Sequence, residues 1–325
     1  MILVTGASGF LGLHLLRALA QGAEPVRALY HSTPPTVQYS NVSWQACNLL
    51  DVYAVEEAMQ GVDKVFHCAA TVSFSGSEAA KMIDDNVLAT QHVVDTAVAF
   101  GVARLIHVSS VAALGRAVAD ENSGIITEDT HWTESKANTA YAQSKFMAEM
   151  EVWRAMAEGL NAAIVNPSII LGEGNWDKGS ANLMRVVDKE FPWYTTGVTG
   201  WVDVQDVAAA LVLLMYSNVV EERYILSAGN FSYKEIFTLM AHALGRKPPS
   251  QLASPLMTEV VWRTEVFKAW LTGKKTAVTK ETARTAQTKC FYGNEKFLEQ
   301  FPSFTYTPIE TTIARMATAF LSEKK

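Results

Sequence analysis

Residues 4–12 read Val4-Thr5-Gly6-Ala7-Ser8-Gly9-Phe10-Leu11-Gly12, and this stretch indicates the fold of the 325-residue chain. An apolar, strand-like run precedes it, and a helix-like pattern from Leu13 to Leu19 follows it. A strand, a glycine turn and a helix in this order are the context of a dinucleotide-binding turn. The spacing is Gly-x-x-Gly-x-x-Gly rather than the commoner Gly-x-Gly-x-x-Gly. A plain glycine-rich loop is the alternative, but the position of the turn at the start of an alternating chain favours cofactor binding.

Each glycine of this turn has a different predicted role. Gly6 allows the tight turn. Gly9 lets a pyrophosphate approach the helix N-terminus, where free N–H groups and the helix dipole favour anions. Gly12 lets the helix pack close to the sheet. Small residues at Ala69 and Ala70, after the fourth strand-like segment, would likewise let a cofactor lie close to the backbone.

Five further apolar segments alternate with helix-like patterns in the first half of the chain. They are Val26–Tyr30, Val42–Cys47, Val62–Ala70, Arg104–Val108 and Ala162–Pro167. The alternation predicts an α/β fold with a Rossmann-like, doubly wound parallel sheet. We expect residues 1–172 to form the dinucleotide-binding domain, with the sheet completed by residues 200–228. Residues 173–325 are expected to form most of a smaller, mostly helical substrate lobe that is interleaved with the sheet.

Helix starts are predicted from residue types that favour the N-cap. Asp51 is placed to cap a helix that ends near Met59, and Asp85 opens one that ends near Phe100. Asp206 and Ser232 are placed to cap later helices. The helices expected in the second half of the chain are Val207–Tyr216, Tyr233–Leu244, Val260–Leu271, Thr279–Ala286 and Pro308–Leu321.

Composition excludes several classes of protein. The formal net charge of −6 and the lack of a long basic run argue against a nucleic-acid surface. Cys47, Cys68 and Cys290 are odd in number and lack metal or redox spacing, which is consistent with a reducing compartment. The apolar run Val207–Tyr216 is too short to span a bilayer, and no signal peptide precedes the first strand. We therefore expect a soluble cytoplasmic protein with no nucleic-acid partner, no membrane partner and no metal.

Tyr141-Ala142-Gln143-Ser144-Lys145 is the stretch that points to chemistry. A tyrosine and a lysine four residues apart share one face of a helix, and helix-favouring residues continue to Ala157, before Gly159. A nearby cation favours the phenolate, so the lysine is expected to lower the tyrosine pKa. The pair could then exchange a proton with an alcohol or carbonyl. The alternative is an ordinary surface helix, because Tyr-x-x-x-Lys is common by chance.

Two serines follow the fifth strand-like segment. Chemistry in open α/β sheets collects at the carboxyl ends of the strands, so Ser110 is placed to meet Tyr141. Ser109 and Ser110 could instead be loop residues that bond to their own backbone. His67, in the fourth segment, is interpreted as a buried strand histidine rather than a catalytic base.

The end of the second strand-like segment bears on cofactor choice. An acidic residue there would bind the ribose hydroxyls of NAD, but the sequence reads His31-Ser32-Thr33. Without an acid, repulsion of a 2′-phosphate is removed, and these residues could contact that phosphate. This favours NADP, with NAD as the alternative. The residues could also simply close the strand.

Taken together, these motifs resemble the extended short-chain dehydrogenase/reductase superfamily, and within it the dihydroflavonol-reductase-like branch of the NAD-dependent epimerase/dehydratase family. The resemblance covers nearly the whole chain. It rests on Val4–Gly12, Phe66–Ala70, the set Ser110, Tyr141 and Lys145, the segment Asn166-Pro167-Ser168, and Trp201–Val207.

The resemblance implies a mechanism in which hydride passes between the nicotinamide and a carbonyl carbon. Tyr141 would exchange the hydroxyl proton, Lys145 would lower its pKa and bind the ribose, and Ser110 would bind the substrate oxygen. Asn86 would support the lysine through water. The cofactor-binding residues implied or chosen by location are Gly6, Ser8, Gly9, Phe10, Leu11, Gly12, His31, Ser32, Asn48, Leu49, Ala69, Ala70, Thr71, Ser109, Tyr141, Lys145, Pro167, Ser168 and Ile169.

Candidate substrate contacts are chosen only by location in the chain, and each could equally pack the lobe. They are Ser73, Phe74, His131, Trp132, Trp176 and Trp193, with Tyr194 beside them. Aromatic residues of the lobe are expected in its core more often than in a substrate wall. The resemblance also implies a homodimer through the helices around Asn86–Phe100 and Tyr141–Gly159.

Several departures from the family pattern narrow the function. The branch often has arginine where His31 stands, and the family commonly has aspartate where Asn48 stands and Arg-Pro where Asn166-Pro167 stands. Val111-Ala112-Ala113 follows Ser110 and offers no acid for a dehydration. No Arg-x-Gly-Asp-type diphosphate clamp is found near the C-terminus. We therefore expect an NAD(P)-dependent reductase or dehydrogenase for a small carbonyl or alcohol. The alternatives are a nucleotide-sugar epimerase with tightly bound NAD and a non-catalytic dinucleotide sensor.

Overall fold

The computed structural model describes residues 1–73, 76–115, 124–135, 138–254 and 285–324. Its largest element is a seven-stranded sheet with the order β11-β7-β5-β4-β1-β2-β3, in which every pairing is parallel. The Rossmann-like prediction is confirmed, and β11 is the strand that completes the sheet beyond the six predicted. The strands are β1 (Ile2–Thr5), β2 (Val26–Tyr30), β3 (Val42–Ala46), β4 (Lys64–His67), β5 (Arg104–Val108), β7 (Ala162–Pro167) and β11 (Glu222–Leu226).

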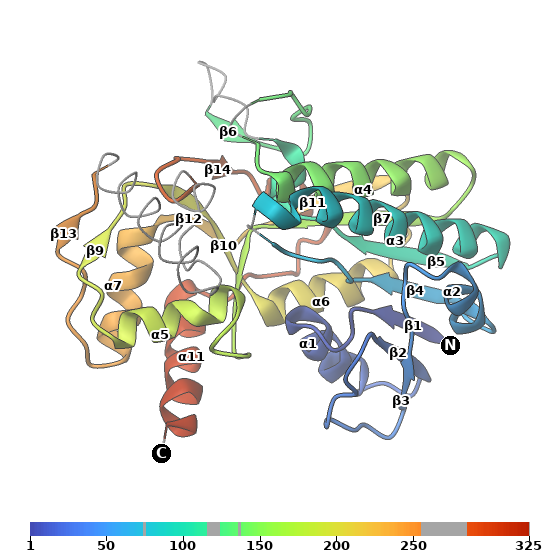
Figure 1. The fold of residues 1–325 in the computed structure, drawn as a ribbon, viewed down its shortest axis with the longest axis horizontal. Helices are drawn as coiled ribbons and strands as arrows, with labels where there is room; N and C mark the ends of the chain where they lie inside the picture. Colours follow the sequence, from blue (N-terminus) through green and yellow to red (C-terminus); the bar gives the residue numbers. More distant parts are fainter. Residues whose placement is uncertain (74–75, 116–123, 136–137, 255–284, 325) are drawn as a thin grey trace.

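Helices cover both faces of this sheet (Figure 1). On one face, α1 (Phe10–Leu19) and α6 (Val204–Met215) pack their leucines and valines against β1, β2 and β4. On the other face, α2 (Val52–Met59), α3 (Ala79–Ala99) and α4 (Ala140–Ala157) form a second apolar core. Because both faces are buried, the strands are apolar along their length, which is why their sequence shows runs rather than alternation.

The strand order reverses between β1 and β4. From β1 the chain continues outward through β2 and β3, whereas β4 leads outward through β5 and β7. Thr5 pairs with His67 at this point, so the glycine turn after β1 lies beside the exit of β4. The carboxyl ends of strands at such a reversal are the usual place for a ligand in open α/β sheets.

The C-terminal part of the chain adds a smaller lobe to one end of the sheet. Its centre is a three-stranded sheet of β8 (Ile169–Leu171), β10 (Val198–Asp203) and β12 (Gly229–Ser232). Trp176 and Trp201 are buried in its core, as expected for most of its aromatic residues. Its helices are α5 (Asn182–Asp188), α7 (Tyr233–Ala243) and α11 (Ile309–Glu323). The helix α10 (Glu295–Gln300) instead packs Phe297 against Tyr224 of β11. Two short strand pairs join β9 (Trp193–Tyr194) with β13 (Gln251–Leu252) and β6 (Ile125–Ile126) with β14 (Phe291–Tyr292).

Two predicted helix starts are wrong. The helix expected to open at Asp85 begins earlier, at Ala79, so Asp85 lies inside α3 and pairs with Lys81. Asp203, not Asp206, caps α6 by accepting a hydrogen bond from the Gln205 amide. Asp206 sits in the first turn of α6, and its carboxylate accepts hydrogen bonds from Thr307 instead.

The other N-cap predictions are confirmed. Asp51 accepts the amides of Tyr53 and Ala54, and Ser232 forms a capping box with Glu235. The helix predicted at Val260–Leu271 and most of that at Thr279–Ala286 lie outside the described residues. Among the helices that the structure does describe, none combines the length and the apolar character needed to cross a membrane.

Candidate active site

The glycine turn presents bare backbone at the start of α1. Gly6 has a positive φ of 63°. The Gly9 amide closes the turn by donating a hydrogen bond to the Gly6 carbonyl at 2.9 Å. Gly9 is the N-cap of α1, no side chain caps the helix, and its first turn carries no acidic residue. The first amide N–H groups of a helix have no acceptor within the helix, so they are available to an anion here.

Close backbone packing explains the choice of glycine at two positions. A Cβ on Gly6 would lie 2.7 Å from the Ala69 backbone, and one on Gly12 would lie 2.2 Å from the Gly6 carbonyl oxygen. Gly12 therefore packs α1 against its own turn, not only against the sheet. The turn therefore lies directly against the β4 exit, and its glycines add no side chain between this backbone and a bound diphosphate.

Phe10 and Leu11 turn their side chains away from this bare backbone. The Phe10 ring packs where Cβ atoms on Gly172 and Gly174 would be, and it makes an edge contact with His14. Leu11 is buried in the core. Of these two predicted cofactor residues, only the amide groups are therefore placed to meet a ligand, while Ser8 and Gly9 are exposed.

A chain of hydrogen bonds ties the β1 and β4 exits to α3. The Ala69 amide donates to the Thr5 hydroxyl at 3.2 Å, and Thr5 Oγ1 lies 2.8 Å from His67 Nδ1. His67 Nε2 lies 3.1 Å from Thr90 Oγ1, and the Thr90 hydroxyl donates to the Asn86 carbonyl. Because Thr90 uses its proton on Asn86, it accepts from His67 Nε2–H, and Nδ1 then accepts from Thr5. Burial lowers the pKa of His67 to about 3, so this ring is a neutral structural group, as its position in a buried strand suggested.

Asn86 holds the loop after β4. Its amide nitrogen donates to the Thr71 carbonyl at 2.9 Å and to Ser144 Oγ at 3.2 Å, and its oxygen accepts the Thr71 amide at 2.7 Å. The side chain therefore fixes Thr71, a predicted cofactor residue, against α4. Both of its N–H groups are used in these contacts, so its predicted support of Lys145 through water stays a prediction.

Ser110 and Tyr141 meet at the carboxyl end of β5. Ser110 caps the short 3₁₀ helix Val111–Leu114 by accepting the Ala112 amide, and its side chain is hydrogen-bonded to Tyr141. Thr139 caps α4, which places Tyr141 in the first turn of that helix. Both side chains remain partly exposed. The structure thus unites two of the predicted catalytic residues from segments far apart in the sequence.

Lys145 occupies the same helix one turn later, but its charge acts differently from the sequence expectation. Its ammonium donates to the Val108 carbonyl at 2.8 Å, and the side chain is buried. Burial lowers the pKa of Lys145 to about 8, opposed by the charge of Glu149. Burial raises the pKa of Tyr141, partly offset by its hydrogen bond with Ser110. Desolvation of the phenol, rather than the neighbouring cation, therefore decides its acidity in this structure.

The predicted residues at the strand ends differ in their exposure. His31 and Ser32 are exposed after β2, and no acidic residue follows them in this turn. Asn48 forms a local turn by accepting the Leu50 amide, and the Leu49 carbonyl bonds to His92. Ser109 is buried, and Ser168 donates to the Leu226 carbonyl. Ala69 and Ala70 lie at the β4 exit, whereas Pro167 and Ile169 end β7 and begin β8.

The predicted substrate residues do not form one wall. Ser73 donates to Glu78, His131 is exposed, and Trp132 stacks on Phe146 with ring centroids 4.5 Å apart. Trp176 is in the lobe core, where its indole donates to Glu323, and its predicted contact with a substrate stays a prediction. Trp193 belongs to β9 at the edge of the lobe, beside Tyr194, and Phe74 lies outside the described residues.

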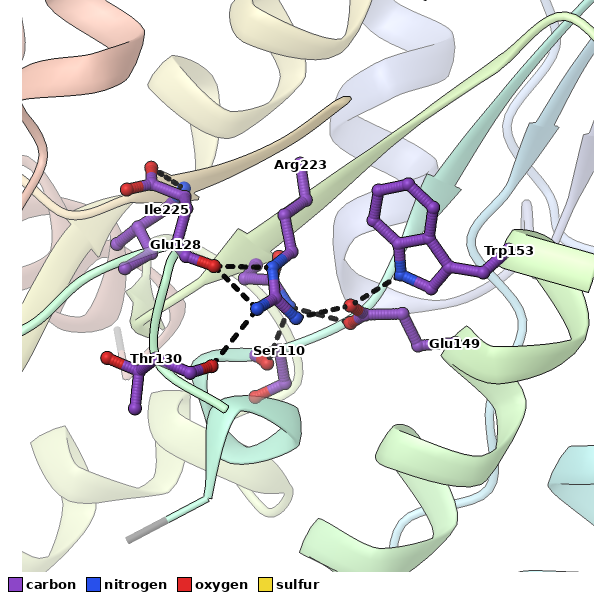
Figure 2. Close-up of polar contacts among 8 residues, drawn as sticks. Ser110, Glu128, Thr130, Glu149, Trp153, Arg223 and Ile225 are labelled. Carbon is purple, nitrogen blue, oxygen red and sulfur yellow. Dashed lines mark hydrogen bonds and ion pairs between the residues drawn. The ribbon is translucent and has the colours of Figure 1, made fainter. Parts of the chain in front are cut away.

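Sequence reasoning missed a buried polar network behind Ser110, shown in Figure 2. Its centre is Glu149, a fully buried carboxylate on α4 that pairs with Arg223 of β11 at 3.1 Å. A glutamate one turn beyond Lys145, on the buried face of α4, was the available signal. Its partner Arg223 is 74 residues away, and nothing local in the sequence links the two.

Comparisons with known proteins agree with the observed fold. A model of the NAD dependent epimerase/dehydratase family matches residues 2–227. Sterol demethylase protein B of Methylococcus capsulatus is 30% identical over 261 residues, which cover 78% of this chain and 77% of that protein. A putative dihydroflavonol 4-reductase of Synechocystis sp. is 30% identical over 282 residues, covering 83% of this chain and 78% of the relative. The crystal structure of gox2253 matches with a TM-score of 0.82 at 26% identity, covering 99% of this chain and 98% of that one.

Proposed function

Because the chain belongs to the NAD-dependent epimerase/dehydratase family, we propose that it is a reductase that transfers hydride from a nicotinamide dinucleotide to a carbonyl group. The family assignment confirms the resemblance seen in the sequence. The enzyme is an NAD(P)-dependent oxidoreductase acting on a small molecule. The observation that carries the choice of acid is the hydrogen-bonded pair Ser110–Tyr141 at the carboxyl end of β5.

The residues of the site have separable tasks in this reaction. The nicotinamide supplies the hydride. Ser110 and Tyr141 each have one hydroxyl proton, so a carbonyl oxygen that displaces their mutual hydrogen bond receives one hydrogen bond from each. As negative charge develops on that oxygen, the phenol gives up its proton.

The electrostatics set the protonation states of the two side chains of α4. Burial raises the pKa of Tyr141, so the phenol is protonated at neutral pH and is ready to act as an acid. Lys145 has a pKa of about 8 and is mostly charged at neutral pH. Its ammonium uses one N–H on the Val108 carbonyl and has others for a ribose hydroxyl or for the phenolate formed during turnover.

We infer a preference for NADP. The turn after β2 carries exposed His31 and Ser32 and no carboxylate, so a 2′-phosphate meets hydrogen-bond donors and no like charge. The uncapped start of α1 and the bare turn at Gly6 are the places for the diphosphate. Residues 1–172, completed by β11, would hold the cofactor, and the lobe from residue 173 would shape the substrate site.

The decisive experiment replaces Tyr141 with phenylalanine. Purified wild type and variant are assayed with a panel of ketones and aldehydes, each with NADPH and with NADH. Loss of the acid is expected to lower kcat by roughly 100- to 10,000-fold while dinucleotide binding changes little. Tyr216→Phe is the matched control, because Tyr216 donates to Glu24 at the opposite, amino-terminal edge of the sheet.

Each result has a distinct meaning. Equal turnover in the Tyr141→Phe protein would refute the proposed acid. Stoichiometric NAD released from the denatured wild type, with no ketone reduced, would favour a nucleotide-sugar epimerase. Normal dinucleotide binding with no turnover of any carbonyl would favour a non-catalytic sensor. The homodimer and the cytoplasmic location predicted from the sequence stay predictions.

A further inference from the structure

Glu149 is a charged group in an unusual place. Its side chain is 1% exposed, between α4 and the sheet. Oε1 accepts hydrogen bonds from Arg223 at 3.1 Å and from the Trp153 indole at 3.3 Å, and Oε2 accepts one from Asn166 at 2.8 Å. Burying a carboxylate costs several kcal/mol of folding free energy unless it is paired and hydrogen-bonded, and both oxygens of Glu149 have such partners.

Arg223 is itself held in place, so it can fix the carboxylate. Its guanidinium donates to the Glu128 carbonyl at 2.9 and 2.5 Å and to the Thr130 carbonyl at 3.1 Å (Figure 2). Glu128 in turn accepts the Ile225 amide on the same strand, β11. The cation is therefore anchored to the segment that leads from β6 toward α4, and it presents one N–H edge to Glu149.

Asn166 connects the Glu149–Arg223 pair to Ser110 of the candidate active site. On β7 it pairs with Ile225 of β11, and its amide nitrogen donates both to Glu149 Oε2 and to the Ser110 carbonyl, the latter at 3.0 Å. The Asn166 side-chain nitrogen has two N–H groups, and each makes one of these bonds. Because the two N–H groups are fixed in one plane, the bond to Glu149 orients the other N–H toward the Ser110 carbonyl. Ser110 is the residue whose side chain meets Tyr141.

We propose that Glu149, Asn166 and Arg223 form a positioning unit that fixes the backbone of Ser110 and thereby aims its hydroxyl at Tyr141 and the substrate oxygen. This proposal rests on the proposed function. None of the three side chains touches the reacting atoms. Glu149 has a second influence through space, because its negative charge opposes the effect of burial on Lys145, one turn away on α4.

The direct test is Asn166→Leu, which keeps a similar volume and removes both donors. We expect kcat to fall by roughly 10- to 100-fold, as for a small misplacement of a catalytic group, with the KM for the dinucleotide changed by less than about 3-fold. The matched control is Trp153→Phe, which removes the longest hydrogen bond to the same carboxylate without touching Asn166. Its kcat is expected to stay within about 2-fold of wild type.

Glu149→Gln is a second variant with less risk to folding. Because Oε1 receives two donors, the glutamine oxygen will take that side and turn its NH₂ toward the Asn166 NH₂. Two donors then face each other, so Asn166 loses its orientation. This variant is expected to lower kcat in the same direction as Asn166→Leu.

A double-mutant cycle with Ser110→Ala separates positioning from a general loss of structure. If Asn166 acts through Ser110, Asn166→Leu should cost less than about 3-fold in the Ser110→Ala background. The Tyr141 ring signal in spectra of protein carrying isotope-labelled tyrosine, assigned with Tyr141→Phe, should move in Asn166→Leu and Glu149→Gln but not in Trp153→Phe. Equal costs in both backgrounds, or a Tyr141 signal that both variants leave unmoved, would overturn the proposal. The spectrum needs no turnover, so it decides this proposal even if the proposed reaction fails.

Discussion

Substitution of Gly12 by alanine should damage the glycine turn from within the helix. The new methyl carbon would lie 2.2 Å from the Gly6 carbonyl oxygen and 2.7 Å from Ala7 Cα. Both neighbours are backbone atoms of the turn, so no side chain can rotate to make room. Either α1 moves away from the turn by about an ångström or the turn opens, and both changes displace the amide groups that would face the diphosphate.

The expected magnitude follows from two opposing effects. Alanine favours a helix over glycine by about 1 kcal/mol. Overpacking of a closely packed site costs about 1–3 kcal/mol, and a clash with backbone belongs at the upper end. We therefore expect the free energy of unfolding to fall by about 2 kcal/mol, and the affinity for NADPH to fall at least about tenfold.

Urea unfolding and fluorescence titration with NADPH measure the two effects separately. Gly22→Ala is the matched control, because a Cβ there would meet only the Leu19 carbonyl oxygen at an ordinary 3.5 Å. It should change the free energy of unfolding by less than about 0.5 kcal/mol and leave binding unaltered. If Gly12→Ala binds NADPH as tightly as wild type and is no less stable than Gly22→Ala, the packing explanation is wrong.

Two further predictions concern stability. Burial lowers the pKa of His107 well below its ordinary value of 6.5, and among the described residues neither ring nitrogen has a partner. The unfolded chain therefore binds a proton below pH 6.5 that the folded chain does not, so the free energy of unfolding falls as pH falls. The variant His107→Phe should be at least as stable as wild type at pH 7. Urea unfolding at several pH values should show that it reduces the slope of the free energy of unfolding against pH by up to about 1.4 kcal/mol per pH unit. Asp203 is fully buried and accepts hydrogen bonds from Arg315 and Thr312 at 2.6 Å each. Asp203→Asn should lower the free energy of unfolding by about 2–3 kcal/mol. This loss is smaller than that expected from breaking an isolated buried ion pair, because Arg315 is partly exposed and still pairs with Glu173. A loss below about 1 kcal/mol would contradict this explanation.

The sheet was predictable because buried parallel strands leave a local record. The bounds of β2, β5 and β7 agree with the apolar segments, and Asp51 and Ser232 cap helices as their residue types suggest. The same reasoning chose the wrong residue where two aspartates lie close together in the sequence. Asp203 and Asp206 have equal cap preference, and tertiary bonds to Thr307 decide which one serves the helix end.

The residues that meet at the site could be predicted from the sequence, but the physical effects that set their pKa values could not. Spacing alone placed Tyr141 and Lys145 on one helix, yet it could not say that burial raises the pKa of the phenol. Nor could it join Glu149 to Arg223, because their contact depends on β11 pairing with β7. Trp176 shows the same limit, since only packing against Phe320 reveals that it faces the lobe core.

The hydrogen bonds from Ala69 through Thr5, His67 and Thr90 to Asn86 run in a single sense, because the Ala69 amide at one end donates and the Asn86 carbonyl at the other end accepts. The imidazole at the end of β4 is consequently held in one tautomer, and with a pKa of about 3 it takes up no proton at any pH where the enzyme would be assayed. A rate profile measured between mild acid and mild base can accordingly be interpreted without contributions from this histidine. That leaves the Lys145 ammonium, with a pKa of about 8, as the group of α4 whose ionisation the kinetics would report.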